Sequence, residues 1–310
     1  MKKFFFFLII FISTATIYYF FFFSPLKEDK ILFVENGKSL KQIANLLEIN
    51  NIIANRQIFA FYFRLLGKDK SIHSGEYLFK KKINFYKVVK TFKKNDLIYR
   101  KITIPECLTV YDITQLLENN PYISGKVLNL PLEGTLFPET YFFLRNESAS
   151  NLVKRMNLKM SEKLDRVWKD NFKHFNSKND LLILASLIEA EAKKKNEKYM
   201  VSSVFHNRLK KNMRLQSDPT ILYEKNLFKK NKNLKIYKKD LQNDNPWNTY
   251  TRKGLPHTPI CNPGIDALNA AANPYITDFL YFVSDGKGGH RFSSSLEEHK
   301  RNIRLWKNNE

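Results

Sequence analysis

The pattern of apolar and polar positions divides the chain into three parts. Residues 4–23, FFFFLIIFISTATIYYFFFF, form an unbroken run of uncharged and mostly apolar residues that would span about 30 Å as a helix. Strand and helix patterns alternate from there to about residue 145, and helical patterns dominate residues 146–310. The chain is therefore predicted to be an α+β protein with an N-terminal transmembrane helix, a small strand–helix module, and a helix-rich domain with β segments.

The residues that flank the apolar run predict its orientation. Lys2 and Lys3 precede it, whereas the charges of residues 27–30 beyond it sum to zero. The positive-inside rule then places residues 1–3 in the cytoplasm and the rest of the chain across the plasma (inner) membrane, with residues 24–30 as a tether. A cleaved signal peptide is the alternative, but the run is longer than a usual signal-peptide core and lacks a small-residue cleavage site before Ser24.

Residues 31–145 contain the same strand–helix pattern twice. Strand-like ILFVE leads to SLKQIANLLE (39–48), and ITIPE leads to TVYDITQLLE (109–118). Each second piece begins with a capping-box pattern and has apolar residues at helical spacing. Two more helices are predicted at 55–66 and 84–94. Compact units of this kind bind glycans or position a neighbouring domain.

Residues 146–310 are predicted to be mainly helical. Helices are expected at 151–170, 178–194 and 198–211, and the lysine-rich stretch 225–239 is typical of a solvated loop or hairpin. A strand, a Gly-rich turn and a helix close the chain: residues 278–285, 286–290 and from 295 onward.

Composition narrows the function further. The formal charge is +22, but 40 lysines stand against 12 arginines and are scattered, so nucleic acid is not the expected partner. The six histidines form no metal-ligand motif and neither a P-loop nor a GxSxG motif occurs, so no metal, cofactor or serine nucleophile is predicted. Cys107 and Cys261 would lie in an oxidising compartment. They could form a disulfide bond there, but the sequence alone does not show whether they do.

Two glutamates interrupt the most apolar helix pattern, LLILASLIEAEA (181–192). A buried carboxyl keeps its proton to higher pH, as a general acid requires. Glu189 and Glu191 point about 200° apart on a helix, so only one can face a given pocket. Lys193 and Lys195 could instead make both of them ordinary surface ion pairs. The pattern alone does not choose between the two glutamates.

Three later segments mix aromatic, amide and Gly/Pro residues: 205–223, 245–264 and 278–299. Aromatic faces beside amide donors suit sugar rings. Together with LASLIEAEA and LEGTLFPETYFF (132–143), these segments resemble the signature blocks of the endolytic murein transglycosylases, membrane-anchored enzymes that cut peptidoglycan strands. The strand–helix module resembles the LysM-like part of that family, which gives predicted bounds of 31–145 for the module and 146–310 for the catalytic domain.

The resemblance implies roles for individual residues. The catalytic glutamate of the family is matched to Glu189, and Gln216, Asp218, Asn248 and Tyr250 are expected to hold the glycan, although Asp218 could instead orient its loop. Glu189 would protonate the bond between N-acetylmuramic acid and N-acetylglucosamine, and the muramic 6-hydroxyl would then close a 1,6-anhydro ring. Peptidoglycan strands and peptidoglycan synthases are the partners implied.

The sequence departs from the family at several points, including Ala192, both cysteines and the lysine-rich stretch. Two other functions stay open at this point. One is a non-catalytic glycan-binding scaffold, and the other is a two-carboxylate glycosidase in which Asp218 or Asp285 is the second carboxylate.

Overall fold

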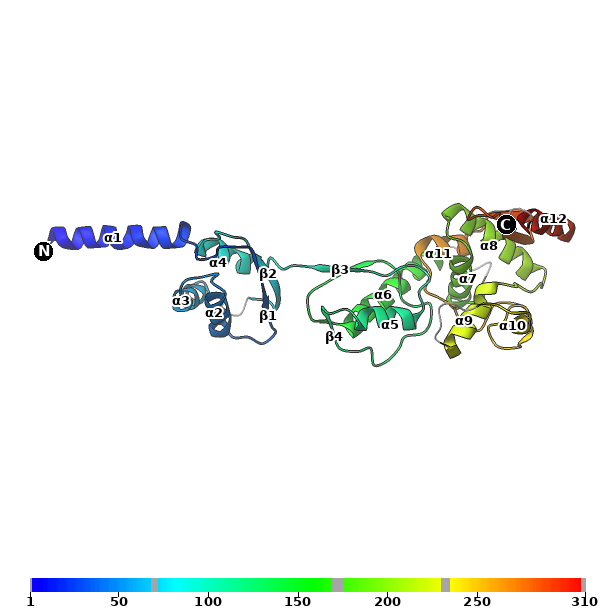
Figure 1. Cartoon of the computed structure of the whole chain (residues 1–310), viewed down its shortest axis with the longest axis horizontal. Coiled ribbons are helices and arrows are strands. Elements are labelled where there is room, and N and C mark those ends of the chain that lie inside the picture. Colours follow the sequence, from blue (N-terminus) through cyan, green and yellow to red (C-terminus); the bar gives the residue numbers. More distant parts are fainter. Residues whose placement is uncertain (1, 68–71, 169–174, 230–234, 308–310) are drawn as a thin grey trace. The chain divides into compact units, whose positions relative to one another are not determined.

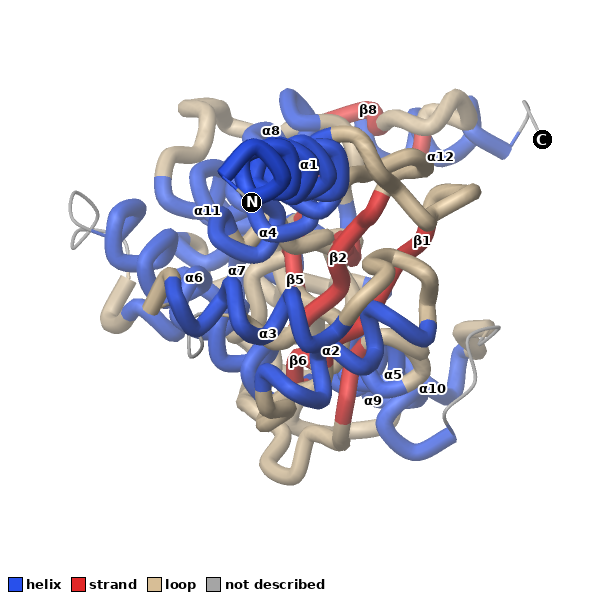
Figure 2. Tube along the Cα trace, turned by 90° about the vertical axis from the view of Figure 1, so that its left-hand side faces the viewer, coloured by secondary structure: helices blue, strands red, loops and turns tan. Residues whose placement is uncertain are grey.

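The computed structural model of the protein describes residues 2–67, 72–168, 175–229 and 235–307. It is an α+β structure in which helices predominate (Figure 1). Figure 2 shows that the strands are short pieces among the helices, and they pair into two-stranded sheets. The predicted mixed, helix-rich α+β class is confirmed.

The chain forms two compact units, residues 1–101 with 142–147 and residues 102–141 with 148–310. It passes from one to the other in β3 (Arg100–Thr103) and returns in β5 (Thr140–Phe143), two strands that pair with each other. Residues 102–141 thus pack with the C-terminal helices, whereas the sequence analysis groups them with the N-terminal module.

The first unit is a small α/β module. Its elements are α1 (Lys2–Phe21), β1 (Lys30–Val34), α2 (Leu40–Ile49), α3 (Arg56–Leu65), β2 (Gly75–Phe79) and α4 (Phe85–Lys94). β1 and β2 are antiparallel, with Lys30 opposite Phe79. Aromatic side chains from α3, β2 and α4 fill the core between sheet and helices, and Phe59, Phe63 and Phe92 are fully buried.

Side-chain caps fix where the helices of this unit begin. Ser39 and Gln42 form the predicted capping box at the start of α2. Asn55 and Asn84 accept hydrogen bonds from the backbone N–H groups three residues on, which starts α3 and α4. The three helices predicted in this region are confirmed.

α1 covers most of the predicted span and ends against α4. The Tyr19 and Phe20 rings contact the Phe85 ring in tilted and edge-to-face arrangements, and the Asn84 side chain donates a hydrogen bond to the Phe21 carbonyl at 2.5 Å. Among the described residues, no helix has both the length and the apolar character needed to cross a membrane.

The second unit is built mainly from helices. Its further elements are α5 (Val110–Glu118), β4 (Ile123–Ser124), β6 (Glu147–Ser148), α6 (Ala149–Trp168), α7 (Lys178–Glu191), α8 (Lys195–Lys210), α9 (Asp218–Lys229), α10 (Lys238–Gln242), α11 (Ile265–Ala272), β7 (Tyr281–Ser284), β8 (His290–Ser293) and α12 (Leu296–Lys307). β7 and β8 form an antiparallel hairpin with Ser284 opposite His290.

α7 lies at the centre of this unit (Figure 1). Every residue from 181 to 189 is buried, because α6, α8, α9 and α11 pack around the helix. This explains why its sequence is apolar on nearly all sides. Any polar side chain that α7 carries is therefore placed inside the protein.

The predicted solvated loop at residues 225–239 is wrong at both ends, which are helical, whereas residues 235–237 are non-helical and largely exposed. α9 continues to Lys229, and α10 begins at Lys238. Lys225 is buried, and its ammonium group donates to the Lys235 carbonyl and to the Asp240 carboxylate, both at 2.6 Å. Residues 230–234, and the predicted end of α6 at 169–170, lie outside the described residues.

Candidate active site

The two glutamates of α7 have different surroundings. Glu189 Oε1 accepts a hydrogen bond from Lys198 Nζ at 2.6 Å, and its Oε2 accepts one from the Gly264 N–H at 3.0 Å. The Glu189 and Lys198 side chains are 4% and 3% exposed. Lys198, from α8, also lies 3.3 Å from the half-exposed Glu106 carboxylate. Glu189 is therefore one half of a buried ion pair.

Burial raises the pKa of Glu189, while the Lys198 ammonium group and the Gly264 N–H favour its charged form and oppose the rise. An ammonium group in direct contact neutralises a buried carboxylate without a proton. Glu189 is not among the residues that line the polar cavity on the other side of α7. The ordinary surface ion pairs considered for Lys195 do not form, because Lys195 pairs with Asp266 at 2.8 Å.

Glu191 faces that polar cavity, which has a volume of about 450 Å³. Its carboxyl accepts a hydrogen bond from the Ser217 hydroxyl at 2.5 Å. Burial raises the pKa of Glu191 to about 7, and the nearby Asp218 carboxylate adds to the rise, while Ser217 and Arg208 oppose it. Glu191 thus has the property expected of a general acid, a carboxyl that holds its proton near neutral pH.

Three of the four residues predicted to bind substrate line the same cavity: Gln216, Asp218 and Tyr250. The Tyr250 hydroxyl donates to Asp218 Oδ1 at 2.5 Å. Aromatic side chains Phe282 and Trp306 form another part of the wall. The cavity therefore combines a carboxyl group, an amide and aromatic faces, the groups that suit a sugar ring.

Backbone pairing brings these residues together. The Gln216 N–H donates to the Thr249 carbonyl at 3.1 Å, and the Ser217 N–H donates to the Thr249 hydroxyl at 2.9 Å. Two segments more than 30 residues apart in the sequence are thereby joined beside the end of α7. Arg208, which is buried, donates to the carbonyls of Leu280 and Leu215, so that the segment before β7 is held against the same loop.

Asn248 has a different position from the other predicted residues. It is 1% exposed and is not among the residues lining the cavity. Its amide N–H groups donate to the carbonyl of Asn243 at 2.7 Å, and its Oδ1 accepts from the Tyr250 N–H at 2.8 Å. Asn248 shapes the loop that carries Tyr250, and a direct contact between Asn248 and glycan stays a prediction.

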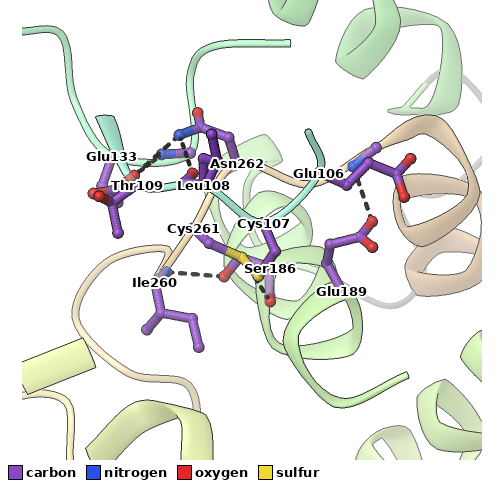
Figure 3. Close-up of a disulfide and its surroundings, with 12 residues drawn as sticks. Glu106, Cys107, Leu108, Thr109, Glu133, Ser186, Glu189, Ile260, Cys261 and Asn262 are labelled. Atoms are coloured by element: carbon purple, nitrogen blue, oxygen red, sulfur yellow. Dashed lines mark hydrogen bonds between the residues drawn. A yellow bond between two sulfur atoms is a disulfide. The ribbon is translucent and has the colours of Figure 1, made fainter. Parts of the chain in front are cut away.

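A disulfide bond joins Cys107 and Cys261 on the Glu189 side of α7 (Figure 3). The pairing that the sequence left open is therefore present. Close to it, Asn262 donates to the Leu108 carbonyl at 2.8 Å, and its Oδ1 accepts from the Leu136 N–H at 2.7 Å. The LEGTLFPE segment is thus held next to the loop that precedes α11.

The sequence analysis missed several residues of the site. Ser217, Arg208 and Lys198 belong to no recognisable motif. The one sequence signal among them was that Ser217 is adjacent to Asp218, a predicted substrate-binding residue. His290 lies in the Gly-rich turn segment and lines the cavity, where its Nδ1 lies 2.9 Å from Glu197 Oε2. Across the residues described, His, Cys, Asp and Glu side chains form no group of three or more that could hold a metal ion.

A glutamate with a pKa of about 7 in a cavity walled by aromatic and amide groups is typical of enzymes that cleave glycans by general acid catalysis. Comparison with known proteins gives the family. A model of the YceG-like family matches residues 32–305, and the chain belongs to that family. The family resemblance found in the sequence is confirmed.

Relatives of the chain carry one shared name. A Bacillus subtilis protein named endolytic murein transglycosylase is 32% identical over 301 residues, which cover 86% of this chain and 82% of the relative. A Streptococcus pneumoniae protein of the same name is 26% identical over 314 residues, and the match covers 87% of this chain but only 57% of that relative. A crystal structure of a YceG-like protein from Listeria monocytogenes is 30% identical with a TM-score of 0.54, covering 89% of this chain and 99% of that one.

Proposed function

We propose that this protein is an endolytic murein transglycosylase that cuts the bond between N-acetylmuramic acid and N-acetylglucosamine in nascent peptidoglycan and so terminates strand growth. Family membership and the shared name of the relatives support the activity. The observation that carries the proposal is Glu191, a carboxyl with a pKa of about 7 in a cavity of sugar-binding character.

Glu191, rather than the predicted Glu189, is the acid that the geometry supports. Both lie on α7, but Glu189 is paired with a buried ammonium group whereas Glu191 faces the cavity. A general acid must carry a proton and reach the leaving group. The raised pKa of Glu191 and its position in the cavity support this role, and Glu189 is better explained as part of the ion pair that joins α7 to α8.

The proposed reaction needs one carboxyl group. Glu191 donates its proton to the glycosidic oxygen as the bond to the muramic C1 breaks, so N-acetylglucosamine leaves with a new hydroxyl. The Glu191 carboxylate then takes the proton of the muramic 6-hydroxyl, whose oxygen bonds to C1 and closes the 1,6-anhydro ring. An intramolecular nucleophile has a high effective concentration, so no positioned water is needed. Gln216 and Tyr250 are proposed to hold the sugars.

One observation favours a second candidate, a two-carboxylate hydrolase. Asp218 is exposed in the same cavity as Glu191 and could activate a water molecule. Asp285 is a weaker partner, because its Oδ1 accepts hydrogen bonds from the N–H groups of Lys287 and Gly289 and it does not line the cavity. The two reactions differ in product: a hydrolase leaves reducing ends.

We further propose that α1 attaches the protein to the plasma membrane, with the predicted single-pass topology. The support is an exposed apolar surface: Phe4, Phe7, Phe11 and Phe22 are each about 70% exposed. Large exposed apolar patches are typical of membrane or protein contacts. Peptidoglycan synthases are the proposed partners, because a nascent strand is still held by the enzyme that elongates it.

Digestion of purified peptidoglycan tests the activity and the choice of acid. The wild-type protein should release products ending in 1,6-anhydromuramic acid, and Glu191→Gln should lower the rate about a hundredfold or more. Reducing ends would favour the hydrolase, and an inactive wild-type protein would favour the scaffold.

A matched variant tests Glu189 without leaving a buried charge unpaired. Glu189→Leu with Lys198→Met replaces the ion pair by apolar side chains of similar size, which commonly preserves folding. This double variant should keep its activity. If it folds but is inactive while Glu191→Gln remains active, Glu189 is the acid and our assignment fails.

A further inference from the structure

A groove lined by lysines lies on the first unit, between α4 and the turn that follows β2. Its volume is about 600 Å³. Six lysines line it: Lys80, Lys81, Lys82, Lys87, Lys90 and Lys94. Leu78, Ile83, Leu97 and Ile98 add apolar side chains, and Asp96 is the single carboxylate among the lining residues. The groove thus combines a strongly positive lining with an apolar component.

The fold itself does not require this concentration of charge. All six lysine side chains are exposed, and none of them forms a salt bridge with a described carboxylate. Lys87 lies in the first turn of α4, where the helix dipole disfavours a cation. Like charges that line one groove repel each other, so a bound anion would relieve an unfavourable arrangement.

The groove lies next to the end of α1. The Lys82 N–H donates to the Leu26 carbonyl at 3.0 Å, and the Lys81 N–H donates to the Asp29 carboxylate at 2.7 Å. Asn84, which caps α4, is bonded to the Phe21 carbonyl of α1. Figure 1 shows α4 at the C-terminal end of α1. If α1 attaches to a membrane, the lysine turn lies within a few residues of the membrane surface.

We propose that this groove binds the phosphate-bearing headgroups of acidic phospholipids in the membrane that α1 contacts. The inference rests on the proposed membrane attachment of α1. Lysine is a compact point charge that suits phosphate, and lysines close to an acidic bilayer each strengthen the attraction to it. The apolar residues of the groove can contact the glycerol and upper acyl carbons of the same lipid.

A vesicle competition separates this inference from the attachment itself. The full chain is mixed with equal amounts of phosphatidylcholine vesicles and of vesicles containing phosphatidylcholine and phosphatidylglycerol in equimolar amounts, with a different dye in each kind. The protein on each kind is measured after flotation. We expect a strong preference for the acidic vesicles. Replacing Lys80, Lys81 and Lys87 by Gln should reduce that preference on the order of a hundredfold, about fivefold for each lysine.

The matched control removes three exposed lysines of the second unit: Lys210, Lys211 and Lys300. It has the same net charge as the groove variant and should keep the preference. Lys82 is left unchanged because its φ of 58° is in the left-handed region. Binding to neither kind of vesicle would refute the attachment of α1, whereas equal binding to both would refute the groove alone.

An equal loss of preference in both lysine variants would show a nonspecific effect of net charge and would also overturn the proposal. Inorganic phosphate, compared with chloride at equal ionic strength, tests the source of the phosphate. We expect no difference between the two salts. If phosphate alone abolishes the preference, the groove is a site for a free anion and not for a lipid headgroup.

Discussion

Replacing Glu191 with Gln should stabilise the protein at alkaline pH while it lowers the activity about a hundredfold or more. The pKa of this carboxyl is about 7 in the folded protein against an ordinary value of 4.5, chiefly because of burial. The folded state therefore binds the proton more tightly than the unfolded state does. The contribution of the protonated Glu191 to the free energy of unfolding is complete below about pH 4.5 and is lost as the pH rises through about 7. The total loss is about 3 kcal/mol.

Gln has the shape of the protonated carboxyl and does not ionise. At alkaline pH the variant therefore keeps the free energy of unfolding that the wild type loses when Glu191 ionises. Between about pH 5 and about pH 8, the free energy of unfolding of Glu191→Gln should rise by about 2.5 kcal/mol relative to the wild type. Burial also raises the pKa of Glu133 to about 7, but that carboxyl is present in both proteins and cancels.

Urea unfolding of both proteins at the two pH values measures this difference. Glu189→Gln is the control, and it should lose about 3 kcal/mol at both pH values because it leaves the buried Lys198 with only the longer contact to the half-exposed Glu106 carboxylate. A difference between Glu191→Gln and the wild type that does not change with pH would refute the raised pKa, and with it the reason for choosing this acid.

Three further substitutions test other parts of the structure. Ser217→Ala removes a donor that lowers the pKa of Glu191, so the alkaline limb of the kcat profile should move up by about 0.7 in pH, and an unchanged profile would contradict this. Cys107→Ser should lower the free energy of unfolding by about 2–5 kcal/mol in urea, with no further loss when its partner cysteine is also replaced. Gly134→Ala should lower the melting temperature more than Gly37→Ala does. Both glycines have φ near +80°, but only at Gly134 would a Cβ lie 2.6 Å from a proline side chain. Equal losses would mean that backbone strain alone matters.

Local sequence patterns predicted where the helices lie. They did not predict which polar side chains are buried, because burial depends on tertiary packing. Ser39 and Asn84 are visible caps, and the helices that follow them begin where the sequence indicates. The prediction for the lysine-rich stretch was wrong at its ends, because its composition is typical of a solvated loop. Burial of Lys225 depends on Asp240, a partner 15 residues on, and no periodicity predicts such a pair.

The same limit applies to the active site. Helical geometry established that Glu189 and Glu191 face opposite sides, but not which side holds the cavity. Lys198 is nine residues beyond Glu189 on another helix, and Ser217 is 26 residues beyond Glu191. The resemblance pointed to this segment and to Glu189, which stays a prediction, whereas the cavity geometry is the reason that we propose Glu191.

The disulfide bond encloses the proposed acid and the proposed sugar-binding residues in one covalent loop, although the cavity wall from Phe282 to Trp306 lies outside it. Cys107 and Cys261 are separated by 154 residues, and Glu191, Gln216 and Tyr250 all lie between them. A single protease cut in an exposed segment of that loop would leave both fragments attached, and they would separate on a gel only after reduction. One such cut would therefore leave Glu191, Gln216 and Tyr250 covalently connected through the disulfide bond.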